Sequence, residues 1–252
     1  MSGTQGVYQW ASGSVMAAIG DDLPTSPASA AEAAAVLRVH GDTHAYPLGI
    51  SIGPRHILLS SWFSNTVEKV DRKTNKLVAT LGDFTGPVDA LEGNDGTLYV
   101  VEVGTGNLVK VSADGKQRSV IAKGLRAPAA MAQGPGNVIY VTENAAGAVT
   151  SLDLGSGARR VVADGLAGPE GIDVGPDGKL YVAEVGQRRV VMVDPATGAR
   201  TVIASNLDIG LETYPGGPPA LVTTGVAVSK SGAIYVSSDR RNAIYKLTPP
   251  AP

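Results

Sequence analysis

Short runs of apolar residues alternate with turn-forming residues along most of the chain, and this pattern repeats every 41 residues. In residues 167–207 the runs are GIDV, KLYVAE, RVVMVD and RTVIAS, and they are separated by turn sequences such as GPDG and PATG. Apolar and β-branched runs bounded by Gly, Pro and Asp are typical of β-strands. The unit therefore predicts four short antiparallel strands.

The same 41-residue step relates equivalent residues in successive units, for example Tyr99, Tyr140 and Tyr181. Four strands in 40–45 residues is the spacing of a propeller blade. Helical repeats would need apolar residues at a period of 3.6, which these runs lack. We therefore expect an all-β fold, a β-propeller of four-stranded antiparallel blades, in one domain spanning residues 1–252.

The register of the repeat divides this domain into blades. Full blades are expected at 44–84, 85–125, 126–166 and 167–207, followed by a partial blade of three strands at 221–249. Residues 6–20 align with the last two strands of a unit, and the Ala-rich residues 24–43 form a non-repeat insertion with a short helix. Two arrangements stay open: the N-terminal strand pair completes the last blade of a five-bladed ring, or the ring is an incomplete six.

The amino-acid composition excludes several classes of function but does not identify a single one. Charged residues make up 17% of the chain and the net charge is −2, so no basic field would attract nucleic acid or a membrane surface. No apolar run is long enough to span a membrane. The absence of cysteine excludes disulfides, thiolate catalysis and Cys-ligated zinc. We expect a monomer, and an extracytoplasmic location after removal of a leader is slightly favoured over the cytoplasm.

The segment PEGIDVGPDGKLYVAEVGQRRVVMVDPATG resembles NHL-repeat proteins and the regucalcin/gluconolactonase-like β-propellers. The resemblance extends over residues 44–249 at the level of the repeat. It implies that the first strand of each blade lines a central channel, with the residue after the proline of the P-x-G motif at the channel mouth. In the gluconolactonase-like family, Asn or Asp at this position binds a divalent metal. The equivalent residues here are Leu48, Val88, Ala129, Glu170 and Thr224.

Glu170 and Thr224, with Asp89 one residue beyond its own position, are the channel-mouth candidates, and Glu170 and Asp89 are the candidate metal ligands. Ca²⁺ and Mg²⁺ prefer such oxygen ligands, but a hydrolytic site needs several of them and an open position for water. Our first hypothesis is therefore a non-catalytic propeller that binds a ligand or protein and requires no cofactor. The alternative is a Ca²⁺- or Mg²⁺-dependent hydrolase, lactonase or lyase acting at the channel mouth.

A row of carboxylates follows the second predicted strand of three blades: Glu102, Glu143 and Glu184. Such a rim can bind a cation or act in acid–base chemistry. It can also be structural, with each carboxylate accepting hydrogen bonds from backbone N–H groups of the following turn. We favour the structural interpretation, because a residue that recurs in every blade serves a need that every blade shares.

Four arginines form a predicted basic rim, two in each of two equivalent loops: Arg188, Arg189, Arg240 and Arg241. Guanidinium groups suit carboxylates and phosphates, so this rim predicts a small acidic molecule or a protein as partner. The alternative is a solvated surface neutralised by Glu184 and Asp239.

Two smaller features are less informative. His40 and His44 flank Asp42, but Gly41 breaks any helix there, so a loop is expected rather than a metal site. The insertion at residues 208–220 interrupts the repeat and predicts either a lid or a longer connection between blades.

Overall fold

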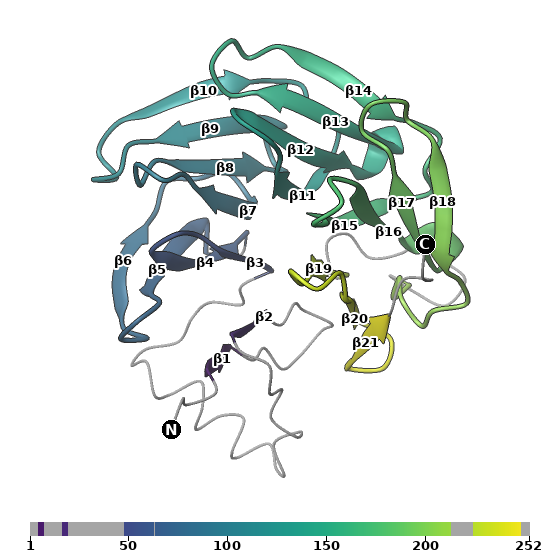
Figure 1. Ribbon diagram of the computed structural model, residues 1–252. Helices are drawn as coiled ribbons and strands as arrows, with labels where there is room; N and C mark the ends of the chain where they lie inside the picture. The colour runs from purple at the N-terminus through teal and green to yellow at the C-terminus, as the bar shows by residue number, and fades with distance from the viewer. Residues whose placement is uncertain (1–4, 8–16, 20–47, 63, 213–223, 248–252) are drawn as a thin grey trace.

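A computed structural model describes residues 5–7, 17–19, 48–62, 64–212 and 224–247. Within these residues, five successive antiparallel sheets are arranged around a common centre (Figure 1). Four of the sheets have four strands and the fifth has three. The prediction of an all-β propeller is confirmed.

Each four-stranded blade runs in chain order from an inner to an outer strand. The first blade is β3 (Gly49–Ile52), β4 (His56–Ser61), β5 (Thr66–Asp71) and β6 (Leu77–Leu81), and the second is β7 (Pro87–Glu92), β8 (Leu98–Glu102), β9 (Asn107–Val111) and β10 (Arg118–Ala122). The third is β11 (Pro128–Gln133), β12 (Val138–Glu143), β13 (Ala148–Asp153) and β14 (Arg159–Ala163). The fourth is β15 (Pro169–Val174), β16 (Leu180–Glu184), β17 (Arg189–Val193) and β18 (Arg200–Ala204).

The fifth blade consists of β19 (Val226–Val228), β20 (Ile234–Ser238) and β21 (Ala243–Leu247). These three strands fall within the partial blade expected from the sequence. At the other end of the chain, β1 (Gln5–Val7) and β2 (Ala17–Ile19) pair with each other in a sheet of their own. Figure 1 places this pair between the first and fifth blades. It is not hydrogen-bonded to β21 in the part of the chain that the structure describes.

Most of the hydrophobic core lies between neighbouring blades, and one smaller cluster of Ile57, Leu59 and Val70 lies within the first blade. One cluster, for example, joins Val149 of the third blade to Leu180 and Val182 of the fourth. Similar clusters lie between the first and second, the second and third, and the fourth and fifth blades. Packing of one sheet face on the next therefore fixes the positions of the inner strands.

Three inner strands begin with proline, at Pro87, Pro128 and Pro169. Proline donates no backbone hydrogen bond and is tolerated at the first residue of a strand. In each case the pairing register shifts directly after the proline, which is the mark of a β-bulge. The bulge lies at the position that the sequence assigned to the channel mouth.

The non-repeat segment 24–43 and its predicted helix lie outside the described residues. In the described part, no helix combines the length and apolarity that crossing a membrane requires.

Candidate functional site in the central cavity

The inner strands of all five blades surround one cavity of about 620 Å³. Side chains from β20 and β21, including Tyr235 and Lys246, also line it. The five predicted channel-mouth residues are all buried and all line this cavity: Leu48, Val88, Ala129, Glu170 and Thr224. The structure therefore brings together one residue from each blade, as the repeat register implies.

Asp89 lies on β7 and connects the second blade to the third. One carboxylate oxygen accepts a hydrogen bond from the backbone N–H of Ala90 at 2.8 Å, and the other accepts one from Met131 at 2.8 Å. Met131 belongs to β11, the inner strand of the next blade. The carboxylate therefore holds two neighbouring inner strands together.

Glu170 makes the equivalent connection between the fourth and fifth blades. Its Oε2 accepts a hydrogen bond from the backbone N–H of Thr224 at 2.9 Å. Its backbone carbonyl accepts one from the Thr142 hydroxyl of the third blade at 2.5 Å. The adjacent Gly171 donates its N–H to the Thr224 carbonyl at 2.9 Å, and a Cβ on Gly171 would lie 2.6 Å from that oxygen. Glycine is needed here because the two backbones approach so closely.

Asp173 also lines the cavity, and the sequence interpretation did not single it out. Its Oδ1 accepts a hydrogen bond from Val174 N–H at 2.8 Å and its Oδ2 one from Val228 N–H, on β19, at 2.7 Å. The available signal was its place as the one charged residue in the run GIDV. A carboxylate in an inner strand must find donors, and the adjacent blade supplies one.

Burial raises the pKa of Asp89 to about 7, although the Met131 and Ala90 N–H groups act in the opposite direction. The negative charge of Asp173 raises it further. Burial also raises the pKa of Asp173 itself, against the hydrogen bonds from Val228 and Val174. The two carboxyl groups therefore share an environment that opposes negative charge.

The acids that line the cavity already accept hydrogen bonds from backbone N–H groups. Asp89 uses both carboxylate oxygens, and Glu170 uses Oε2, to accept backbone N–H groups. Among the described residues, no group of three or more His, Cys, Asp and Glu side chains is placed to hold a metal ion. His40, Asp42 and His44 lie outside the described residues.

The carboxylates of Glu102, Glu143 and Glu184 are buried and do not line the cavity. Each accepts a backbone N–H from the connection that enters its own blade: Thr85 for Glu102 at 2.9 Å, Arg126 for Glu143 at 2.7 Å, and Ala167 for Glu184 at 2.9 Å. We expected the backbone donor in the following turn, but it lies 17 residues earlier. The antiparallel pairing of the first and second strands explains this, because it brings the start of one beside the end of the other.

Glu143 has the most complete set of partners. It accepts the Thr150 hydroxyl at 2.5 Å, and one nitrogen of Arg159 approaches its two oxygens at 2.6 and 2.8 Å. In the next blade, Glu184 pairs with Arg189 Nε at 2.6 Å. These contacts join the second strand to other strands and to the entering connection of the same blade.

The four arginines of the predicted basic rim all contact carboxylates. Arg188 and Arg241 both pair with Asp208, at the start of the insertion. Arg189 pairs with Glu184, and Arg240 Nη1 lies 3.6 Å from Glu212 Oε1. The neutralising acids are thus Glu184, as expected, together with two residues of the insertion. Of the insertion, residues 213–220 lie outside the described part.

Arg188 has an unusual backbone conformation, with a positive φ of 51°. The equivalent residues in the other blades also have positive φ and are Gly or Asn: Asn65, Gly106, Gly147 and Asn242. A residue with a Cβ is disfavoured in this region, and Asn is the usual exception besides Gly. Arg188 offsets part of this cost by donating Nε to the Leu207 carbonyl at 2.9 Å.

The fold and the cavity define the class of this protein as a β-propeller with a central cavity. Residues 156–185 match the model of the strictosidine synthase-like family, N-terminal part. This match covers the outer strand β14 of the third blade and the inner strands β15 and β16 of the fourth. No curated protein matches the chain.

Solved structures similar to this chain are also propellers. Virginiamycin B lyase from Staphylococcus aureus has 17% sequence identity and a TM-score of 0.61, covering 79% of this chain and 65% of the lyase. A streptogramin B lyase has 16% identity and a TM-score of 0.58, covering 82% and 70%. A nidogen/laminin complex has 15% identity and a TM-score of 0.57, covering 76% and 77%. Identities this low show a shared fold, and the narrower NHL or gluconolactonase-like assignment stays a prediction.

Proposed function

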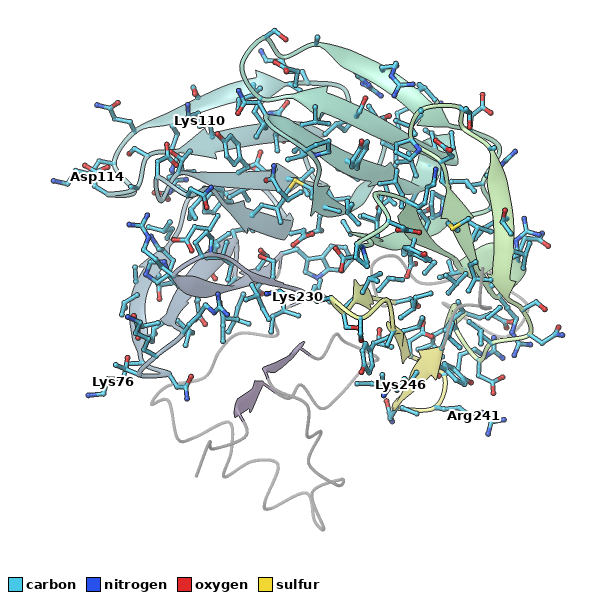
Figure 2. All side chains as sticks on the ribbon, in the orientation of Figure 1. Lys76, Lys110, Asp114, Lys230, Arg241 and Lys246 are labelled. Atoms are coloured by element: carbon cyan, nitrogen blue, oxygen red, sulfur yellow. The ribbon has the colours of Figure 1, made fainter. Side chains whose placement is uncertain are left out.

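We propose that this protein is a non-catalytic binding propeller that holds a small molecule in its central cavity. The observation that carries the proposal is the cavity itself, which the inner strands of five blades enclose. Its volume of about 620 Å³ lies in the range typical of small-molecule sites. Figure 2 shows the blade side chains extending toward this central region, with Lys230 and Lys246 labelled on the fifth blade.

The arrangement of the polar groups in the cavity favours ligand binding over catalysis. Asp89, Glu170 and Asp173 use carboxylate oxygens to join neighbouring inner strands. Groups fixed in this way make a preformed pocket, which lowers the entropic cost of binding. A nucleophile paired with a base is not found among the described residues that line the cavity.

A metal-dependent hydrolase or lyase is the second candidate, and one observation favours it. Asp89 lines the cavity with its pKa raised to about 7, and a carboxyl near neutral pKa suits general acid–base catalysis. The resemblance to gluconolactonase-like propellers points the same way. Measurement of bound metal in protein purified without chelator, with assays of lactone hydrolysis, tests this candidate directly.

The structure gives less support to an acidic partner at the basic rim than to a small molecule in the central cavity. Arg188, Arg189, Arg240 and Arg241 each contact a carboxylate of the same chain. A partner would have to compete with Asp208 for two of them.

The proposal is tested by a ligand-observed NMR screen of a fragment library against three proteins. Ala227 lies on β19, is exposed and lines the cavity, so Ala227→Trp fills the pocket without entering the core. Val161 lies on β14 and is also exposed, but away from the cavity. We expect fragments that bind the native protein to be lost in Ala227→Trp and retained in the matched control Val161→Trp.

Two results would contradict the proposal. Binding that persists in Ala227→Trp would place the site elsewhere. Conversion of a bound fragment to product, followed in the same spectra, would show that the cavity is catalytic.

A further inference from the structure

We propose that the first blade carries a second binding site, away from the central cavity, for a phosphate group or a similar doubly charged oxyanion. Four cationic side chains form this site, which we call the basic surface of the first blade: Arg55, Arg72, Lys73 and Lys76. These four residues do not line the central cavity. The inference therefore does not depend on the proposed function.

The four cations come from two turns that are hydrogen-bonded to each other. Residues 53–56 connect β3 to β4, and residues 71–76 connect β5 to β6. The backbone N–H of Arg72 donates to the Arg55 carbonyl at 3.1 Å, and Arg72 Nη1 donates to the Gly53 carbonyl at 2.8 Å. The two turns therefore hold their cationic side chains close together.

Glu92, on β7 of the second blade, fixes the first of these turns. Its side chain is fully buried, and its Oε2 accepts the backbone N–H groups of Arg55 at 3.0 Å and of His56 at 2.9 Å. Its Oε1 lies 2.5 Å from His56 Nδ1. A Cβ on Gly53 would lie 2.4 Å from Glu92 Oε2, so this close approach requires glycine. The backbone that carries Arg55 is thus preformed, which lowers the cost of binding a ligand there.

The carboxylates nearest to these cations are already bound by the protein. Asp71 Oδ1 accepts the backbone N–H of Lys73 at 3.1 Å, the backbone N–H of Thr74 at 2.8 Å and the Thr74 hydroxyl at 2.8 Å. Glu92 is buried, and its Oε1 lies 3.7 Å from Arg55 Nε, beyond hydrogen-bond distance. The acids therefore serve the turns and leave the cationic groups available to a ligand.

These cations are particular to the first blade. Arg72, Lys73 and Lys76 form no ion pair with any described residue, and Arg55, Lys73 and Lys76 are exposed. The equivalent turns of the next three blades together contain one cationic residue, Lys116: 112–117, 153–158 and 194–199. Because those blades form the same turn without the additional cations, the fold does not require them.

The arrangement favours a compact oxyanion over an extended acidic segment of a protein. A guanidinium presents a planar set of donors that matches two oxygens of a phosphate, and an ammonium adds a point charge. An extended acidic segment would need a longer row of cations. The neighbouring turns of the second blade instead expose Asp95 and Asp114, and Figure 2 shows Lys76 and Asp114 on these adjacent blades.

Inorganic phosphate is the probe for this site. It is titrated into the native protein at constant ionic strength, and binding is followed by NMR of the backbone amides. We expect saturable shifts within residues 53–56 and 71–76, and binding at least about tenfold tighter than that of acetate, which carries one charge. Sodium chloride at the same ionic strength is the control for screening.

Variants then test the individual cations. Lys73→Gln leaves the backbone hydrogen bond to Asp71 in place and should weaken phosphate binding by about fivefold. Lys116→Gln, on the equivalent turn of the second blade, is the matched control and should change binding by less than about twofold. Arg55→Lys keeps the charge but loses the planar set of donors, so we expect weakening by about threefold.

Several outcomes would overturn the inference. These are equal shifts with sodium chloride, equal binding by Lys73→Gln and the native protein, or failure to saturate below about 20 mM phosphate. Loss of phosphate binding in Ala227→Trp would place the anion in the central cavity instead. Binding of a polyglutamate peptide to the two turns without binding of phosphate would identify an acidic protein as the partner.

Discussion

The outer strands and the inner strands of the propeller both contact the neighbouring blade, but they do so through different side chains. The outer strands β10, β14 and β18 all begin with arginine and carry an exposed valine at the third position: Val120, Val161 and Val202. Each arginine donates to a backbone carbonyl in the connection before its own blade: Arg118 to Asp83 at 3.0 Å, Arg159 to Gly124 at 3.2 Å, and Arg200 to Asp164 at 2.7 Å.

Around the cavity, the inner strands and the second strand β12 use serine, aspartate or threonine side chains, and no single residue type joins every pair of blades. Ser51 donates to the Ala90 carbonyl, Asp89 accepts from Met131, Thr142 donates to the Glu170 carbonyl, and Asp173 accepts from Val228. The outer positions thus recur with the blade, whereas the inner ones are particular to their place in the ring. The residues that recur in three blades make the same contacts in each of them, whereas the residues that line the cavity differ from blade to blade.

The largest effect is expected at a recurring residue. Glu143→Ala leaves the Arg126 N–H, the Thr150 hydroxyl and Arg159 without their buried partner. We expect a loss of about 4 kcal/mol in the free energy of unfolding, measured by urea denaturation. Glu143→Gln keeps the volume and some of the hydrogen bonds, so its loss should be smaller. A loss below that of an ordinary surface substitution would contradict a structural role for the glutamate row.

The second effect is a pH dependence that originates at an inner residue. Because the folded-state pKa of Asp89 is raised to about 7 from 3.8, its contribution to stability is present below its unfolded pKa and is lost as pH rises through about 7. Between about pH 5 and pH 8 the native protein should lose about 2 kcal/mol from this group. Asp89→Asn should flatten that dependence in urea denaturation at each pH. A variant that keeps the full slope would place the titration on another group.

The third effect tests the close contact of two inner strands. Gly171→Ala would place a Cβ 2.6 Å from the Thr224 carbonyl oxygen and push β15 away from the fifth blade. We expect a loss of about 2 kcal/mol in thermal or urea unfolding. Gly82→Ala is the matched control, because a Cβ there meets nothing within 4 Å. Equal effects of the two substitutions would remove the argument from close approach.

The smallest effect is expected at Arg188, which has a positive φ at a loop position where the other blades have Gly or Asn. Arg188→Gly and Arg188→Ala both remove the pair with Asp208, but only Gly relieves the positive φ. We therefore expect the Gly variant to be more stable than the Ala variant by about 1 kcal/mol in urea denaturation. At Arg189, which begins β17, the order should reverse because Gly weakens a strand. The same order at both positions would show that the backbone of Arg188 is not strained.

The sequence predicts the blades well because the signal is periodic and local. The tyrosines at 99, 140 and 181 mark the second strands β8, β12 and β16, and the same register identifies the residues that line the cavity. These inferences need only the turn residues and the 41-residue step.

The partners of the polar side chains could not be predicted in the same way. The reach of Asp89 to Met131 depends on how two blades pack, which no local pattern encodes. We expected the hydrogen-bond donors of Glu102, Glu143 and Glu184 in the turn that follows each glutamate. The donors instead lie 17 residues earlier in the chain, because antiparallel pairing brings the start of the first strand beside the end of the second. Asp173 was missed because a single acid in an apolar run has no motif of its own.

The hydrogen bond from each row glutamate to the entrance of its blade has a consequence for how such a chain can grow. Glu102 and Thr85, or Glu184 and Ala167, lie within one 41-residue unit, so a duplicated gene segment would carry this closure along with it. The links between inner strands lie across unit boundaries and must be made anew with each added neighbour. Duplication of a unit therefore preserves the hydrogen bonds within each blade. The residues that line the centre of the ring can then differ from one copy to the next and change which ligands fit.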